Sequence, residues 1–318
     1  MADFYTGKKV VVTGGAGFIG SRVVSFLCER GAQVVVTVRK ESDPWRLAEL
    51  QSRLHIVECD GTDREMVRGL IMAERPEIIF NLASLVNTTQ SLDVMDEVLH
   101  NNFLTTKYLL EAARDAGVRK FVQVGTIEEY GLCPVPFFED EREVPISPYS
   151  LSNVMATHLA LLYNRMTNLS VTVVRPAATY GPKQNFTMLT PVFIRAALLG
   201  NDFEMNPGGQ IKDLIFVDDV ALGMLLAGEV EGARGEIINL GSGHRYNLKE
   251  VVLMINQLMG NPVAVHFGAH PYRPLDPMRF YMDSHKARRL LGWHARTDLI
   301  SGMKKTVRWY TEHYADVH

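Results

Sequence analysis

Tyr149 and Asn153 stand four residues apart in the stretch SPYSLSN. Ser147 and Pro148 are residue types that begin a helix, so both side chains are expected on one helix face. A lysine in place of Asn153 would put an ammonium beside the phenol and lower its pKa by about two pH units. Asparagine carries no charge. Tyr149 is therefore a candidate acid or base that lacks this electrostatic support.

Thr126 and Glu128 are two further candidates, in the loop GTIEEYG. Thr126 comes directly after the β-rich run KFVQV, at the carboxyl end of a strand, where open parallel sheets bind their ligands. Glu128 follows in the same loop. Its residue type alone leaves open whether it joins the site or is a loop carboxylate that faces water.

A glycine pattern near the start of the chain predicts a dinucleotide site. In VVVTGGAGFIGSRVV, Gly14, Gly17 and Gly20 follow a strand and open a helix. Glycines let a tight turn close and let the backbone approach a pyrophosphate, whose charge is favoured at the helix N-terminus. The alternative is a glycine turn with only a structural role.

The end of the second strand indicates which dinucleotide is preferred. The sequence VVVTVRKES places Val38 where an acidic residue would hold the ribose of NAD, and Arg39 and Lys40 follow. Two cations and no carboxylate favour the 2′-phosphate of NADP(H), although NAD(H) remains possible and the pair could be a solvated basic turn. Asp60, after the next strand, is either an adenine contact or a helix cap.

The elements that must position these residues alternate along the chain. Strand-like runs at KKVVVT, AQVVVTV, LHIVE, EIIFN, KFVQV and SVTVVRP are separated by helical periodicity, and GEIINL follows later. This alternation of strands and helices predicts an α/β fold with a doubly wound parallel sheet. Beyond Pro176, loops rich in proline and glycine indicate a smaller, interleaved lobe. We expect a cofactor domain at 1–180 plus about 214–245, and a substrate lobe at about 181–213 plus 246–318.

Composition excludes several classes of protein. A net charge of −3 and the absence of a basic, aromatic-rich stretch argue against nucleic-acid binding. We find no apolar run of about 20 residues and no signal-peptide pattern, so we expect a cytoplasmic protein that does not bind membranes. The three cysteines are far apart and indicate neither a disulfide framework nor a metal site.

Eight motifs together resemble the extended short-chain dehydrogenases/reductases that act on nucleotide sugars. They stand in family order across nearly the whole chain: TGGAGFIG (13–20), NLAS (81–84), GTIEEYG (125–131), SPYSLSN (147–153), RPAATYGPKQN (175–185), GGQIKDLIFVDDVA (208–221), NLGSG (239–243) and YRPLDPMRFYMDSHKARRLLGW (272–293). The resemblance implies a Rossmann-like fold. Within the group, the VRK turn is similar to GDP-mannose 4,6-dehydratases and GDP-4-keto-6-deoxymannose reductases.

The resemblance also implies roles for individual residues. The catalytic positions are Thr126, Tyr149, Glu128 and Asn153, where Asn153 replaces the lysine of a YxxxK motif. Cofactor positions are Gly14, Gly17, Phe18, Ile19, Gly20, Arg39, Lys40, Asp60, Leu82, Ala83, Asn102 and Asn153. Substrate positions are Asn185, Lys212 and Arg273, near the sugar and diphosphate. Lys183 or Lys212 is a candidate to replace the missing ammonium in space.

These roles lead to one expected function and two alternatives. The first is NADPH-dependent reduction at C4 of a nucleotide-linked 4-keto-6-deoxy hexose, with Tyr149 and Thr126 protonating the oxygen. The second is a 4,6-dehydratase or epimerase that recycles its own cofactor. The third is an impaired protein that only binds nucleotide sugar or NADP. Helices at about 92–117 and 148–166 resemble the family's dimer interface, which implies a homodimer.

Overall fold

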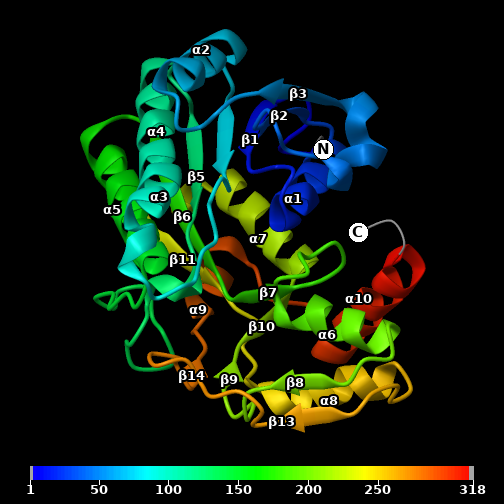
Figure 1. Ribbon diagram of the computed structural model, residues 1–318. Helices are drawn as coiled ribbons and strands as arrows, with labels where there is room; N and C mark the ends of the chain where they lie inside the picture. The colour runs from blue at the N-terminus through cyan, green and yellow to red at the C-terminus, as the bar shows by residue number, and fades with distance from the viewer. Residues whose placement is uncertain (1–2, 315–318) are drawn as a thin grey trace.

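A parallel seven-stranded sheet forms the centre of the computed structural model, which describes residues 3–314 (Figure 1). Its strands are β1 (Lys9–Thr13), β2 (Gln33–Val38), β3 (Leu54–Glu58), β4 (Ile78–Asn81), β5 (Lys120–Val124), β6 (Ser170–Pro176) and β11 (Ile237–Leu240). Their order is β11-β6-β5-β4-β1-β2-β3, so the direction of winding reverses between β1 and β4. The expected doubly wound sheet is confirmed, and ligands bind such sheets at the carboxyl ends beside this reversal.

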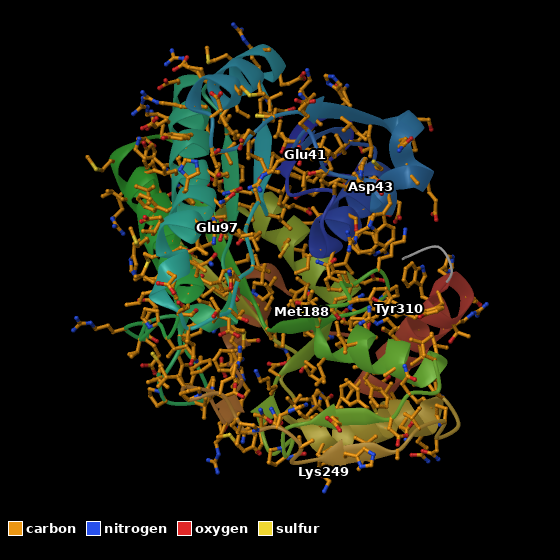
Figure 2. All side chains as sticks on the ribbon, in the orientation of Figure 1. Glu41, Asp43, Glu97, Met188, Lys249 and Tyr310 are labelled. Atoms are coloured by element: carbon orange, nitrogen blue, oxygen red, sulfur yellow. The ribbon has the colours of Figure 1, made fainter. Side chains whose placement is uncertain are left out.

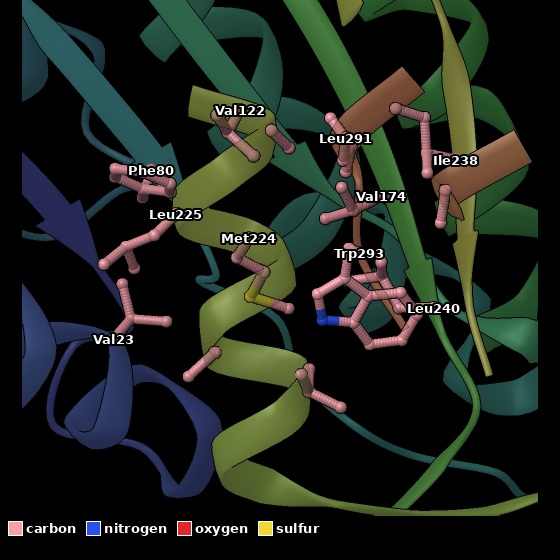
Figure 3. Close-up of a cluster of buried hydrophobic side chains, with 14 of the residues drawn as sticks. Val23, Phe80, Val122, Val174, Met224, Leu225, Ile238, Leu240, Leu291 and Trp293 are labelled. Atoms are coloured by element: carbon pink, nitrogen blue, oxygen red, sulfur yellow. The ribbon is translucent and has the colours of Figure 1, made fainter. Parts of the chain in front are cut away.

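Helices cover both faces of the sheet (Figure 1). One face carries α2 (Arg64–Glu74), α4 (Thr105–Asp115) and α5 (Pro148–Met166), and the other carries α1 (Phe18–Glu29), α7 (Val217–Glu229) and α9 (His285–Leu291). Figure 3 shows Val23 of α1, Phe80 of β4 and Leu225 of α7 pointing toward one another, and all three are fully buried. Each such side chain stabilises the fold by roughly 1.5–3 kcal/mol.

Most of the remaining elements lie in the lower half of Figure 1. They are β7 (Ala178–Tyr180), α6 (Leu189–Leu198), β8 (Phe203–Met205), β9 (Ile211–Lys212), β10 (Leu214–Phe216), β12 (Tyr246–Asn247), α8 (Leu248–Leu258), β13 (Val265–Phe267), β14 (Arg279–Phe280) and α10 (Leu299–His313). Three small sheets join them, in the orders β10-β7, β12-β9-β14 and β13-β8. The stretch DLIFVDDVALGMLLAG begins as strand β10, because residues 214–216 pair with 178–180, and continues as α7.

The helix expected at about 92–117 is broken. It consists of η2 (Leu92–Val94), α3 (Met95–Val98), the π-helical turn η3 (Leu99–Leu104) and α4. Short 3-10 turns also occur at η1 (Trp45–Arg53), η4 (Ile127–Glu129) and η5 (Glu231–Ala233). Such π turns are frequent at functional sites, and this one carries the buried Asn102. Between residues 3 and 314, no helix is long and apolar enough to cross a membrane.

Candidate active site

Tyr149 lies in the first turn of α5, as the sequence predicts. Ser147 caps the helix, and its hydroxyl accepts a hydrogen bond of 3.1 Å from the amide of Ser150. The Ser150 hydroxyl accepts one of 3.0 Å from the amide of Ser147 in return. Pro148 occupies the first helical position, where its missing N–H costs nothing. This rigid start holds Tyr149 at the carboxyl end of the sheet with only 7% of its surface exposed.

Burial and two nearby hydroxyl groups act on the pKa of the Tyr149 hydroxyl. Burial is the main cause that raises the pKa of Tyr149 to about 12, and the charge of Glu128 acts in the same direction. Hydrogen bonds with the side chains of Thr126 and Ser84 lower the pKa, but by less. The strongest influences on this group therefore include no cation. Tyr149 is a phenol and not a phenolate near neutral pH.

Asn153 occupies the position of the absent lysine but does not reach toward the phenol. Its side-chain nitrogen donates a hydrogen bond of 2.9 Å to the backbone carbonyl oxygen of Tyr149. Lys183 does not supply the missing charge, because its ammonium donates to the carbonyl oxygen of Arg46 at 3.4 Å. Lys212 lies over the ring of Phe280, 5.2 Å from its centroid. Neither lysine takes over the role.

A buried ion pair between Glu129 and Arg175 holds Thr126 in position. Thr126 caps η4, and its amide donates a hydrogen bond of 2.9 Å to Oε1 of Glu129. The other carboxylate oxygen of Glu129 accepts hydrogen bonds of 3.0 and 2.7 Å from Arg175, and both side chains are fully buried. Arg175 also donates to Glu143 at 2.6 Å. The hydroxyl of Thr126 is thereby held toward Tyr149.

Glu128 faces the site and is only partly buried. Burial raises its pKa, while the charges of Lys212 and Arg273 oppose that effect. The structure thus brings these three predicted residues close enough to interact. Arg273 also lies 3.5 Å from the backbone oxygen of Thr88. Ile127, between Thr126 and Glu128, is buried in the core instead.

Asn185 is held by a different group of residues. Its side-chain oxygen accepts a hydrogen bond from Arg46 of η1, and Arg46 also donates to the carbonyl oxygen of Lys183 at 2.8 Å. Next to Arg46, the ring of Trp45 stacks on Trp309 of α10 at 6.2 Å between centroids. Figure 2 labels Glu41 and Asp43 on the segment that leads into η1 and Tyr310 on α10. The segment after β2 is therefore connected by hydrogen bonds to the loop that carries Asn185.

The glycine loop has the geometry that a pyrophosphate requires. Gly14 has a φ of +66°, and a β-carbon there would lie 2.5 Å from the carbonyl oxygen of Leu82. A β-carbon at Gly20 would overlap the carbonyl oxygen of Gly14. Gly17 is the N-cap of α1, without a side-chain cap and without an acidic residue in the first turn. The free N–H groups of this helix start fit an anionic dinucleotide.

Four other predicted cofactor residues lie in or beside this loop. Amide nitrogens of Leu82 and Ala83 donate to Thr13, at 3.1 Å to its carbonyl oxygen and 3.3 Å to its hydroxyl. The ring of Phe18 lies against Gly181, and Ile19 packs on the main core.

Arg39, Lys40 and Asp60 lie beyond the ends of β2 and β3. Arg39 donates a hydrogen bond to the side chain of Asn101, and Lys40 is exposed. The carboxylate of Asp60 accepts hydrogen bonds from Thr62, which lower its pKa. The helix-cap alternative for Asp60 is wrong, because Asp63 is the N-cap of α2.

Comparison with known proteins places the chain in a family. Residues 10–241 match the model of the NAD dependent epimerase/dehydratase family. The chain belongs to this family. Its relatives are enzymes of the extended short-chain dehydrogenase/reductase type, as the motifs indicated.

Individual relatives extend over almost the whole chain. A UDP-glucose 4-epimerase of Mycolicibacterium smegmatis is 33% identical over 313 residues, which are 95% of this chain and 98% of that protein. The epimerase Mth375 of Methanothermobacter thermautotrophicus superposes with a TM-score of 0.92 at 30% identity, covering 98% and 95% of the two chains. A dTDP-glucose 4,6-dehydratase of Streptomyces venezuelae, solved with NAD bound, gives 0.87 at 27% identity, covering 96% and 98%.

Three residues near the site were not predicted as site residues from the sequence. Ser84 influences the pKa of Tyr149, Arg46 holds Asn185, and Glu129 anchors Thr126. For Glu129 a signal existed, because Thr126-x-x-Glu129 has the spacing of a capping box. Ser84 and Arg46 influence site residues that are distant in the sequence, and no local sequence pattern indicates such proximity.

Proposed function

We propose that this enzyme reduces the C4 carbonyl of a nucleotide-linked 4-keto-6-deoxy hexose with NADPH. The observation that carries the proposal is the buried Tyr149, whose pKa is raised to about 12 and beside which residues 3–314 place no ammonium. A phenol that keeps its proton is suited to giving it to a developing alkoxide. It is poorly suited to removing a proton from a sugar hydroxyl. Reduction is therefore the direction that this site favours.

Tyr149 and Thr126 would have different roles at the sugar oxygen. When bound, NADPH supplies the hydride. Tyr149 donates its proton to the oxygen at C4, and the hydroxyl of Thr126 orients the same oxygen. The ion pair of Glu129 and Arg175 keeps Thr126 in place without taking part itself.

The loop after β5 supports reduction over dehydration. In the family's 4,6-dehydratases this loop resembles T-D-E or T-S-E, with a polar middle residue and a glutamate that acts as base at C5. Here the middle position is Ile127, which is buried in the core. Glu128 retains the glutamate, and we propose that it faces the sugar near C4 and C5.

Lys212, Arg273 and Asn185 are proposed to bind the nucleotide diphosphate and sugar. The charges of Lys212 and Arg273 both lower the pKa of Glu128, so the two cations lie close enough together to act on one anionic group such as a diphosphate. They come from the elements at about 181–213 plus 246–318, which we propose as the substrate lobe. Residues 1–180 plus about 214–245 would then form the cofactor domain.

NADP(H) is proposed as the preferred cofactor. Val38 ends β2 without a carboxylate, and Arg39 and Lys40 follow it. An arginine at this point accommodates a 2′-phosphate. NAD is named with the solved Streptomyces relative, so NAD(H) is the alternative to be measured.

A homodimer through α4 and α5 is proposed as the assembly. Leu162 and Met166 lie one turn apart on α5 and are 41% and 75% exposed. Apolar side chains on one exposed helix face indicate a protein interface. A two-fold axis would pair this face with its copy.

An epimerase or a dehydratase is the second candidate, favoured by the Mycolicibacterium relative named UDP-glucose 4-epimerase. The first experiment measures NADPH oxidation with GDP-, UDP-, dTDP- and CDP-linked 4-keto-6-deoxy hexoses. Stoichiometric oxidation with one of them supports the reductase and identifies the nucleotide. Turnover of unreduced nucleotide sugars without NADPH consumption would establish the epimerase or dehydratase instead. A protein that binds but turns over neither class is a binding protein.

A further inference from the structure

Arg46 rests on a tryptophan ring and reaches across to the loop that follows β7. Its guanidinium lies 4.3 Å from the centre of the Trp45 ring, which in turn stacks on Trp309 of α10. The Nε atom of Arg46 donates a hydrogen bond of 2.8 Å to the carbonyl oxygen of Lys183, and Nη2 donates one to Oδ1 of Asn185. These contacts join three segments that are far apart in the sequence.

The backbone next to Asn185 is held by further hydrogen bonds. The ammonium of Lys183 donates one of 3.4 Å to the carbonyl oxygen of Arg46. The carbonyl oxygen of Gln184 accepts one from the hydroxyl of Tyr310, on α10. The side-chain nitrogen of Gln184 donates one of 2.8 Å to the carbonyl oxygen of residue 179. Because residues 183 and 184 are fixed in this way, the orientation of the Asn185 amide is decided by its own contacts.

Arg46 determines which way that amide faces. A guanidinium can only donate hydrogen bonds, so the amide atom beside Arg46 must be the oxygen. The nitrogen of the amide then points away from Arg46. Asn185 is exposed, and within residues 3–314 the structure gives its side-chain nitrogen no acceptor. Asn185 therefore has two N–H donors left for a ligand.

The charge of Arg46 favours a ligand with negatively charged oxygens. Both acceptors of its guanidinium are neutral oxygens, and among residues 3–314 Arg46 forms no ion pair. The side chain is half-buried, and burial lowers its pKa, although a guanidinium stays protonated. Hydrogen bonds to charged oxygens are roughly twice as strong as those to neutral ones. A phosphate oxygen therefore suits the donors of Asn185 better than a sugar hydroxyl does.

We propose that Arg46 is a positioning residue for the nucleotide diphosphate, because it fixes Asn185 as a hydrogen-bond donor to a phosphate oxygen. The inference rests on the proposed nucleotide-sugar substrate and on the role of Asn185 there. It does not depend on which reaction takes place at C4. The segment after β2, on the cofactor side of the molecule, thereby contributes to the substrate site.

Binding of GDP, UDP, dTDP and CDP to the whole protein, measured by calorimetry, tests this without turnover. For the nucleotide that binds the wild type most tightly, Asn185→Ala should raise Kd about tenfold, the loss of one hydrogen bond to a charged group. Arg46→Ala should raise Kd at least threefold, since the amide then adopts both orientations. The two substitutions together should fall well short of the product of the single factors, because Arg46 acts through Asn185. Asn185→Asp should bind more weakly than Asn185→Ala, since its second oxygen faces the phosphate.

Two controls separate this role from a structural one. Arg195 of α6 is also half-buried, and its guanidinium lies 5.2 Å from the centre of the ring of Phe186, next to Asn185. Arg195→Ala removes a cation from the same loop without touching the amide, so it should leave Kd unchanged. Arg46→Ala should also leave Kd for NADPH unchanged. An equal loss for NADPH, or factors for Arg46→Ala and Asn185→Ala that simply multiply, would overturn the inference.

Failure of this inference is distinguishable from failure of the proposed function. Unchanged nucleotide binding in Arg46→Ala, with weaker binding in Arg273→Ala, would overturn the role of Arg46 and leave the proposed substrate site standing. A wild type that binds a nucleoside diphosphate but does not oxidise NADPH would overturn the reductase alone. A wild type that binds none of the four nucleotides would overturn both the substrate site and the role of Arg46.

Discussion

The side-chain amide of Asn153 donates a 2.9 Å hydrogen bond to the backbone carbonyl oxygen of Tyr149, one helical turn earlier on α5. The substituted residue therefore stabilises its own helix and leaves the phenol oxygen to Thr126 and Ser84. Loss of the lysine has not left a vacant position, because Asn153 is 4% exposed and packed in place. The site differs from a YxxxK site in charge more than in shape.

Restoring the lysine should raise the phenolate population of Tyr149. An ammonium near Tyr149 lowers its pKa by about two pH units, so the phenolate population at neutral pH rises about 100-fold. Asn153→Lys should therefore raise kcat/KM for oxidation of the C4 alcohol by up to that factor, and because the equilibrium constant is unchanged, kcat/KM for reduction should rise in proportion. Asn153→Gln, which adds length without charge, is the control. Equal effects of both variants in steady-state assays of each direction would contradict this account.

The two directions should differ in pH dependence. Because the pKa of Tyr149 is raised to about 12, its proton is retained until the pH rises through that value. Reduction should show no alkaline decline from Tyr149 below pH about 10, and oxidation should rise about tenfold per pH unit. The charge of Glu128 raises the pKa of Tyr149, so Glu128→Gln should move the oxidative profile to lower pH. A profile of kcat against pH for both proteins decides this.

The ion pair behind Thr126 should contribute strongly to stability. Glu129 and Arg175 are fully buried, so within residues 3–314 Glu129→Gln leaves the buried guanidinium with Glu143 as its one remaining charged partner. Breaking such pairs costs about 3–5 kcal/mol, and we expect a loss near the lower end because glutamine still accepts hydrogen bonds. Urea unfolding measures it. The neighbouring Glu128→Gln is the control and should cost far less, so equal losses would refute the assignment.

The sequence predicted those features that depend on local patterns. Buried parallel strands appear as β-branched runs, and Ser147 with Pro148 marks the start of α5. Gly14 appeared as part of a loop pattern, and its φ of +66° explains why glycine is needed there. These signals lie within a few residues of the element that they specify.

Contacts between distant segments could not be predicted in this way. Asn102, on a π turn, holds the segment after β4 against α5, and this brings Ser84 close enough to influence the pKa of Tyr149. The pairing of Arg46 with Asn185 joins positions separated by 139 residues. Neither contact leaves a periodic signal, since each depends on how complete elements pack.

The basic turn after β2 should set the cofactor preference. Arg39→Ala combined with Lys40→Ala removes both cations that would face a 2′-phosphate, so KM for NADPH should rise at least tenfold while KM for NADH changes little. Val38→Asp should go further and favour NADH, because a carboxylate can hold the ribose hydroxyls and repels the phosphate. Initial rates with both cofactors test this. A wild type that prefers NADH, or a double variant with an unchanged ratio, would contradict the NADP assignment.

The apolar face of α5 should hold the dimer together. Leu162 and Met166 are 41% and 75% exposed, and lysine at both positions would place two charges in the centre of a symmetric interface. Light scattering after gel filtration should give twice the chain mass of 35.7 kDa for the wild type. The variant with lysine at both positions should give the mass of one chain. Leu253 on α8 is 43% exposed and provides the control, since Leu253→Lys adds a charge on a different surface and should leave the dimer intact. A wild type that elutes as a monomer would show that this face has another use, whereas dissociation by Leu253→Lys as well would place the interface elsewhere.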